Sequence, residues 1–280
     1  MKYKIFIIGK ILLSAIGVMT LFAAIIGLGN YLQSINYKYI GNFFMMLFPV
    51  SVYGYVGYLN KKINKLSLAD YGFTAHRLIQ NLGLGFIVST VIMGAVLLAS
   101  GPILGSTVEF MPLKENFLSP LISLAAMAII VGVWEEFYFR GFVFNTLVNA
   151  KFGFHISALV SSLLFSILHW TSFDMDETSW LWYIGIVLIG YILVVIYTLS
   201  KSIWSVVAFH FLWNFYATLL DSEENEIGLS SIKNYAGGSK SIDNLTVIIL
   251  ATALALLLLF SHRKIKQLYP AKNMFTFPGK

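Results

Sequence analysis

The chain has 280 residues, of which 58% are hydrophobic and only 11% are charged. Soluble domains have about 45–50% apolar and about 25% charged residues, so the composition excludes an ordinary water-soluble globular protein, a disordered chain and a coiled coil. The mean hydropathy of +0.78 points the same way. The chain has no cysteine, which excludes disulfides, thiolate metal sites and a cysteine nucleophile.

Apolar runs predict eight membrane spans, because a helix needs about 20 apolar residues to cross a hydrocarbon core of ~30 Å. In chain order the runs cover residues 5–29, 40–60, 82–104, 118–148, 154–172, 179–200, 202–220 and 243–261. We therefore predict an all-α fold class, a polytopic membrane helical bundle of about eight transmembrane helices. Residues 1–280 are expected to form a single integral membrane domain, with the motif-bearing core at 118–220. Residues 61–81 are basic and partly amphipathic, so we expect them to lie at the membrane surface.

The placement of the charges predicts the orientation of these spans. With the N-terminus inside, thirteen of the 19 Lys and Arg residues fall in inner segments and four in outer loops, while Lys10 and Arg140 fall within spans. This distribution follows the positive-inside rule, so both termini are predicted to be cytoplasmic. The net charge of +6 then reflects topology, and no nucleic-acid partner is expected. The orientation was chosen from Lys and Arg alone. In this orientation ten acidic residues fall in the outer loops: Glu109, Glu115, Asp174, Asp176, Glu177, Asp221, Glu223, Glu224, Glu226 and Asp243.

Polar residues at membrane depth are the candidate functional residues, because burying ionisable groups in a membrane is costly. They are Glu135, Glu136 and Arg140 in the fourth span, His169 with Phe165 in the fifth, and His210 with Asn214 in the seventh. Glu136 and Arg140 are spaced i,i+4, so they can pair on one helix face. Glu135 points about 100° away and stays free to act as a general base.

Helix geometry also predicts which of these residues share a depth. Glu135 and His169 are equally far from residue 152, in the short turn that joins two antiparallel spans. Each therefore lies about 20 Å along its helix from that turn, at a rise of about 1.5 Å per residue. His210 and Asn214 lie roughly 12–20 Å along their own span by the same rise. One carboxylate, two imidazoles and one amide are thus expected at a common depth.

The set E135-E136-x-x-x-R140, F165-x-x-x-H169 and H210-x-x-x-N214 resembles the CAAX-protease and bacteriocin-processing family (CPBP, or Abi). The resemblance covers about residues 118–220 and implies a glutamate-dependent intramembrane endopeptidase of the CAAX prenyl protease type. It implies the following roles for the residues of the set: Glu135 and His169 activate water, His210 and Asn214 stabilise the oxyanion, and Glu136 and Arg140 form a supporting pair. Phe165 is expected to shape the site by packing. No side-chain nucleophile is required.

The resemblance implies no cofactor and no metal. The expected partners are membrane lipids and a membrane-associated peptide or a lipidated protein as the substrate. We expect a multi-pass protein of the bacterial cell membrane, and no oligomeric state is predicted.

Alternative functions remain open at this point. One Glu and two His can bind zinc, so a metal-dependent membrane hydrolase is a mechanistic rival, although an HExxH motif is absent. A non-catalytic bacteriocin-immunity or scaffold protein can retain the same motifs, and a transporter also places polar groups at the midplane of the membrane. In these cases Glu136 and Arg140 anchor a helix, the histidines are core residues, and Asn214 hydrogen-bonds between helices.

Overall fold

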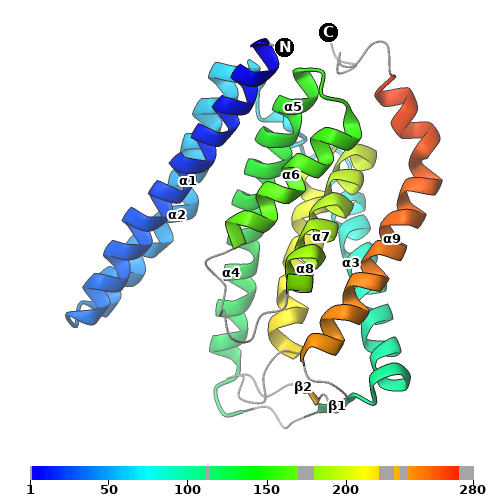
Figure 1. Cartoon of the computed structure of the whole chain (residues 1–280). Coiled ribbons are helices and arrows are strands. Elements are labelled where there is room, and N and C mark those ends of the chain that lie inside the picture. Colours follow the sequence, from blue (N-terminus) through cyan, green and yellow to red (C-terminus); the bar gives the residue numbers. More distant parts are fainter. Residues whose placement is uncertain (1, 111–113, 170–179, 221–229, 234–238, 271–280) are drawn as a thin grey trace.

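Long helices account for most of the computed structural model, which describes residues 2–110, 114–169, 180–220, 230–233 and 239–270 (Figure 1). The long helices are α1 (Lys2–Ser34), α2 (Lys38–Leu59), α3 (Leu78–Leu104), α4 (Leu118–Glu136), α6 (Phe154–Leu168), α7 (Trp180–Ser200), α8 (Ile203–Leu220) and α9 (Ser239–Leu268). They coincide with the eight predicted spans, so the predicted helical membrane bundle is confirmed. Residues 170–172 and 179 of two predicted spans, and the predicted outer acids at 174–177 and 221–226, lie outside the described residues.

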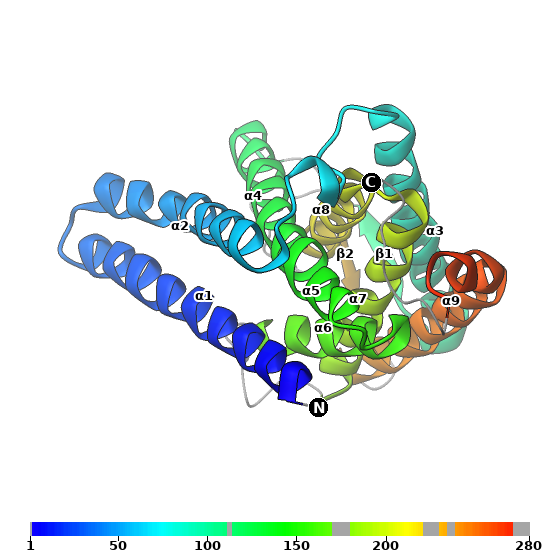
Figure 2. The ribbon, with the colours of Figure 1, turned by 90° about the horizontal axis from the view of Figure 1, so that it is seen from above.

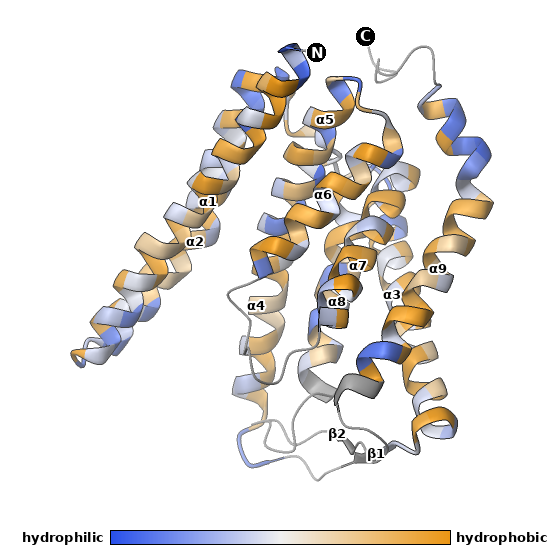
Figure 3. Ribbon diagram, in the orientation of Figure 1, coloured by the Kyte–Doolittle hydropathy of each residue, from blue (hydrophilic) through white to orange (hydrophobic). Residues whose placement is uncertain are grey.

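Within the described residues, six helical stretches are long and apolar enough to cross a membrane, and α6 is a shorter apolar helix. Most residues along these helices are hydrophobic, and hydrophilic residues gather near several helix ends (Figure 3). Large apolar side chains face outwards along them; Leu98 and Phe260, for example, are 81% and 83% exposed. The start of α1 and the end of α9 lie at the same end of the bundle, as an even number of crossings requires (Figure 1).

Helix α8 lies near the centre of the bundle, where it contacts α3, α4 and α7. Helices α1 and α2 pack against each other as a hairpin that leans away from the other helices (Figure 2). Both members of the hairpin attach it to the other helices: α2 contacts α4 and the segment that follows α4, and Ser14 of α1 shares a hydrogen bond with Tyr138 of that segment. One face of α4 is therefore turned to the hairpin and another to α8.

The fourth predicted span is not a single α-helix. Helix α4 ends at Glu136 and continues as a π-helix, η3 (Phe137–Phe144), before the short helix α5 (Asn145–Asn149). All eight residues of η3 are buried. Wide i→i+5 turns of this kind are rare and often occur at functional sites. Apolar periodicity predicts a continuous helix over residues 118–148 and gives no signal for the wider turns.

The segment predicted to lie at the membrane surface is partly inserted into the bundle. A π-helical turn, η1 (Asn60–Asn64), follows α2, and a 3₁₀ turn, η2 (Ala69–Tyr71), buries Tyr71 completely. Gly72 has φ +81°, and a Cβ there would collide with the backbone carbonyl of Lys201. The Tyr197 hydroxyl donates to the Tyr71 carbonyl at 3.3 Å. These contacts tie the segment to α7 and to the start of α8.

A short antiparallel strand pair lies at the opposite end of the bundle from the start of α1 (Figure 1). Strand β1 (Thr107–Phe110) pairs with β2 (Ser230–Lys233), with Thr107 opposite Lys233. The pair joins the segment after α3 to the segment after α8 and adds a small element to the predicted helical fold.

Candidate active site

The Glu136–Arg140 pair is formed as predicted. Nη1 of Arg140 donates to Oε1 of Glu136 at 2.8 Å, and both side chains are fully buried. Nη2 of Arg140 donates to the Gly190 carbonyl at 3.0 Å, and the guanidinium carbon lies 4.5 Å from the centre of the Phe165 ring. A Cβ on Gly190 would lie only 3.0 Å from Cβ of Ser162, so glycine allows α7 to approach α6 here. The pair is thereby fixed to two neighbouring helices.

Glu136 also holds His210. Nδ1 of His210, on α8, lies 2.8 Å from Oε1 of Glu136, so this carboxylate oxygen contacts both the guanidinium and an imidazole. With Glu136 ionised, Nδ1–H of His210 is the donor. The other ring nitrogen, Nε2, lies 3.5 Å from Oε2 of Glu135. The sequence predicted the pairing of Glu136 with Arg140 but not its bond to His210.

His169 is oriented in the same manner by a backbone group. It directly follows the last residue of α6, and its Nδ1–H donates to the Phe165 carbonyl at 2.7 Å. Carbonyls in the last turn of a helix lack an intrahelical partner, so they are available as acceptors. Nε2 of His169 then faces Glu135, at 3.8 Å from Oε2.

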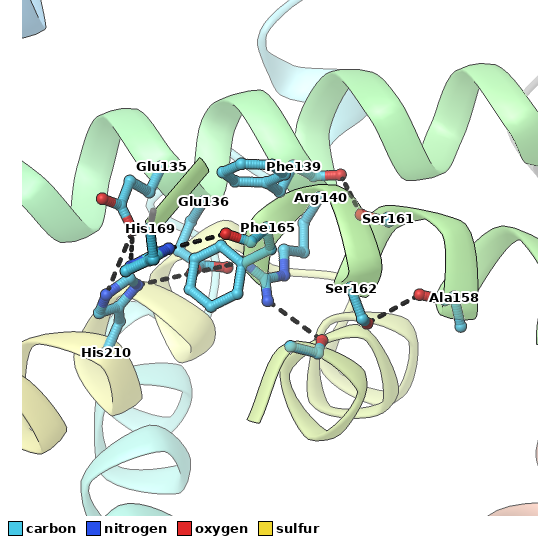
Figure 4. A network of polar contacts seen from close by, with 11 residues as sticks. Glu135, Glu136, Phe139, Arg140, Ala158, Ser161, Ser162, Phe165, His169 and His210 are labelled. Atoms are coloured by element: carbon cyan, nitrogen blue, oxygen red, sulfur yellow. Dashed lines mark hydrogen bonds and ion pairs between the residues drawn. The ribbon is translucent and has the colours of Figure 1, made fainter. Parts of the chain in front are cut away.

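Glu135 is the residue on which the two imidazoles converge (Figure 4). Both Nε2 atoms approach the same carboxylate oxygen, Oε2, which has no hydrogen-bond partner within the described part of the chain. Glu135 is 7% exposed and Glu136 is fully buried, and the two carboxylates face opposite ring nitrogens of His210. The predicted common depth of Glu135, His169 and His210 is confirmed.

Residues 117–216 match the model of a family described as type II CAAX prenyl endopeptidase Rce1-like. This segment is similar to that family, and we refer to it below as the Rce1-like segment. No curated protein matches the chain. The Rce1-like segment contains all seven predicted site residues and confirms the resemblance that the motifs predicted. Together with the six candidate membrane-crossing helices, it indicates a multi-pass integral membrane protein with a CAAX protease-type segment. The roles of the individual residues stay predictions.

The charged groups at the site contact one another directly. Glu136 is paired with the guanidinium of Arg140, whereas Glu135 faces the imidazoles of His169 and His210. A proton on the imidazole of His210, which faces both carboxylates, would make the four groups neutral together. Buried charges are tolerated when they are paired and hydrogen-bonded, and Glu136 meets both Arg140 and His210 in this way.

An apolar cavity of about 440 Å³ opens on one side of the site. It lies between the α1–α2 hairpin and α4, and Glu135 and His169 form part of its wall. The other lining residues are mostly apolar: Val18, Met19, Phe22, Ile26, Asn42, Met45, Met46, Phe48, Pro49, Met127, Ile130, Val131, Trp134, Phe139 and Leu168. This volume falls in the range of about 300–1,000 Å³ that is typical of ligand pockets.

A second cavity, of about 210 Å³, lies on the other side of His169. Asn214 lines it together with Phe165, His169 and His210, so the predicted oxyanion residue reaches the site as part of this wall. The structure thus brings Glu135, His169 and His210 into direct proximity, while Asn214 borders the adjacent space.

Asp243 lines the second cavity, and the sequence did not predict this position for it. It was expected in an outer loop, but it belongs to α9 and falls within the apolar stretch Ile242–Leu268. The signal was present in the spacing of Asp243, Thr246, Val247 and Leu250, which places all four on one helix face. Asp243 was counted with the loop acids because it stands at the boundary of the predicted span.

Proposed function

We propose that the chain is a membrane endopeptidase that hydrolyses a peptide bond with water activated by Glu135 and His169. The observation that supports it most strongly is the convergence of two imidazole Nε2 atoms on the free oxygen of Glu135, at 3.5 and 3.8 Å. A carboxylate base oriented against imidazole is a common arrangement for general acid–base catalysis. The Rce1-like match, whose name describes an endopeptidase, supports the same reaction class.

The proposed reaction begins with a water molecule between Glu135 and His169. Their facing atoms are 3.8 Å apart, which is too long for a direct hydrogen bond, and a polar gap of this kind suits a bridging water. Glu135 takes one proton from the water, and the resulting hydroxide adds to the carbonyl carbon of the scissile bond. When the tetrahedral intermediate collapses, the C–N bond breaks and Glu135 returns the proton to the departing amine. The products are a carboxylic acid and an amine.

We propose His210 and Asn214 as the donors to the oxyanion of this intermediate. His210 must carry protons on both ring nitrogens, because Nδ1 is committed to Glu136 and only Nε2 is left to donate to the substrate. Preorganised donors at a developing oxyanion contribute a large share of the rate enhancement in many hydrolases.

The apolar cavity beside Glu135 supports a membrane-associated substrate. Its 440 Å³ and its lining of Met, Phe, Ile and Val side chains suit an apolar group such as the lipid of a prenylated peptide, which the name of the matched family includes. We propose a lipidated or otherwise apolar peptide as the substrate class. The single-domain organisation and the catalytic core at 118–220 stay predictions.

The test is cleavage of a farnesylated peptide by the full-length protein reconstituted in lipid vesicles. Glu135→Gln, His169→Ala and His210→Ala should each lower the cleavage rate by about 10²–10⁴-fold, the usual contribution of a general acid or base. Glu115→Gln, which neutralises an exposed carboxylate in the loop before α4, serves as the matched control and should cleave like the wild type. Wild-type cleavage rates in all three site variants would contradict the proposal. If cells that express Glu135→Gln were still protected against a bacteriocin, the result would favour a non-catalytic immunity protein.

A further inference from the structure

The second cavity carries a carboxylate that the proposed reaction does not use. Asp243 lies on α9, in a stretch apolar enough to cross a membrane, and its side chain is half-buried. An ionisable residue in such a stretch is costly and marks a functional site by default. The cavity shares His169, His210 and Phe165 with the candidate active site, so a group bound in it lies close to the reacting atoms.

Two helices contribute polar residues to this cavity. Helix α8 contributes His210, Asn214 and Ala217, which are spaced i, i+4 and i+7. Helix α9 contributes Asp243 together with Thr246 on the next turn. The cavity wall therefore combines one carboxylate with hydrogen-bonding groups, in contrast to the apolar cavity on the other side of His169.

The wall also contains aromatic rings of a kind that can bind a cation. Trp182 of α7 and Trp213 of α8 both line the cavity. Indole rings attract ammonium and guanidinium groups through their negative faces. The cavity wall contains no Lys or Arg among its described residues, and His210 in the same wall already faces two carboxylates of its own, Glu135 and Glu136. The charge of Asp243 is therefore the one that a bound cation would balance.

The size of the cavity limits the ligand to a small group. At 210 Å³ it is below the range of about 300–1,000 Å³ that is typical of pockets for drug-sized ligands. It has room for one side chain and is about half the size of the apolar cavity. The two cavities lie on either side of His169, so a peptide crossing the site can place a different group in each.

Resting on the proposed endopeptidase function, we propose that this cavity binds a lysine or arginine side chain of the substrate close to the scissile bond, with Asp243 as its counter-charge. The same carboxylate disfavours a free substrate carboxylate in this position, because like charges repel strongly in a partly buried site. The preferred substrate therefore carries a basic residue near the cut rather than an acidic one.

The experiment measures binding of farnesylated peptides in which one lysine is moved along an uncharged sequence, with norleucine at the same position as the reference. The full-length Glu135→Gln protein in lipid nanodiscs is used so that the peptides stay intact. At one position, lysine should bind about tenfold more tightly than norleucine, between the small effect of an exposed ion pair and the large effect of a buried one. Adding Asp243→Asn should abolish this preference, whereas Asp243→Glu should retain it.

The matched control is Glu115→Gln, which removes an exposed carboxylate outside the cavity and should leave the preference intact. If Asp243→Asn does not fold, Ala217→Leu decides the question, because it narrows the cavity while keeping Asp243. Loss of the lysine preference in that variant supports the inference. Absence of a preference at every position, or a preference that survives Asp243→Asn or Ala217→Leu, overturns it.

The binding measurement tests this inference, whereas cleavage by the wild type tests the proposed function. Lysine-selective binding by a protein whose wild type cleaves none of the peptides would contradict the endopeptidase and keep the basic-side-chain site. The wild type could instead cleave the lysine and norleucine peptides with equal efficiency while Glu135→Gln binds them equally. That result would support the endopeptidase function and overturn the proposed basic-side-chain site.

Discussion

Nδ1 of His210 lies 2.8 Å from Oε1 of Glu136, on the same carboxylate oxygen that accepts from Arg140. Glu136 therefore positions a candidate catalytic imidazole in addition to anchoring its own helix. Its neighbour Glu135 faces the free Nε2 atoms of both histidines. The two adjacent glutamates should respond differently to the same substitution.

Glu136→Gln should lower both stability and activity, whereas Glu135→Gln should lower activity alone. Removing the Glu136 charge leaves the fully buried guanidinium of Arg140 without its counter-ion, and breaking a buried ion pair costs about 3–5 kcal/mol. Glu135 has no hydrogen bond to lose at Oε2 within the described residues. Thermal unfolding in detergent micelles, measured beside the cleavage rate, separates the two variants. Equal unfolding midpoints would contradict the positioning role of Glu136.

Arg140→Lys should be destabilising although it keeps the charge. A lysine ammonium cannot reproduce the planar fork that reaches Glu136 and the Gly190 carbonyl together. Loss of a buried hydrogen bond from a charged donor costs about 1.5–3 kcal/mol, and the shift of Glu136 should also reduce cleavage. Arg263→Lys, at an exposed position on α9, is the control and should leave the unfolding midpoint unchanged. Wild-type stability in Arg140→Lys would show that the bond to Gly190 contributes nothing.

Val131→Trp should weaken the binding of substrates with a long apolar group. Val131 lines the apolar cavity, and an indole there displaces apolar substrate surface that is worth about 0.8 kcal/mol per methylene. Displacing two methylenes would raise KM by roughly tenfold, with a smaller effect on kcat. Ile129→Trp on the same helix is the control, since Ile129 is 48% exposed and does not line the cavity. The same rise in KM for a short, unlipidated peptide would argue that the cavity does not hold the apolar group.

Cleavage should persist in the presence of a chelator. The proposed reaction places the water between Glu135 and His169 and uses His210 as a donor, which leaves no ligand set for a metal. In the ranges that the structure describes, no group of three His, Cys, Asp or Glu side chains is arranged to hold a metal ion. The measurement is the cleavage rate before and after EDTA, with a zinc protease treated in parallel. Activity that vanishes with EDTA and returns with zinc would establish the metal-dependent alternative.

The sequence predicted the depth of the site residues but not their rotation about each helix axis. Depth follows from counting residues, so Glu135 and His169 could be matched through the turn at residue 152. The i,i+4 spacing was enough to predict the bond between Glu136 and Arg140. The bond from His210 to Glu136 depends on how α8 is rotated against α4, and no local pattern specifies that rotation.

Two further features could not be predicted for related reasons. The π-helix at Phe137–Phe144 is almost entirely apolar, so a change from α to π turns leaves its hydrophobic pattern looking helical. Asp243 lies where a loop becomes a span, and its position on α9 decides whether it faces the second cavity or water. In both cases the outcome is set by tertiary packing, which residue spacing alone does not reveal.

Glu135, His169 and His210 come from three parts of the chain that are synthesised one after another. A nascent chain that has inserted α4 and α6 holds a carboxylate and one imidazole, and it lacks the second imidazole until α8 arrives. Biogenesis itself therefore delays the assembly of the full set. The proposed catalytic set is therefore complete only once α8 is in place.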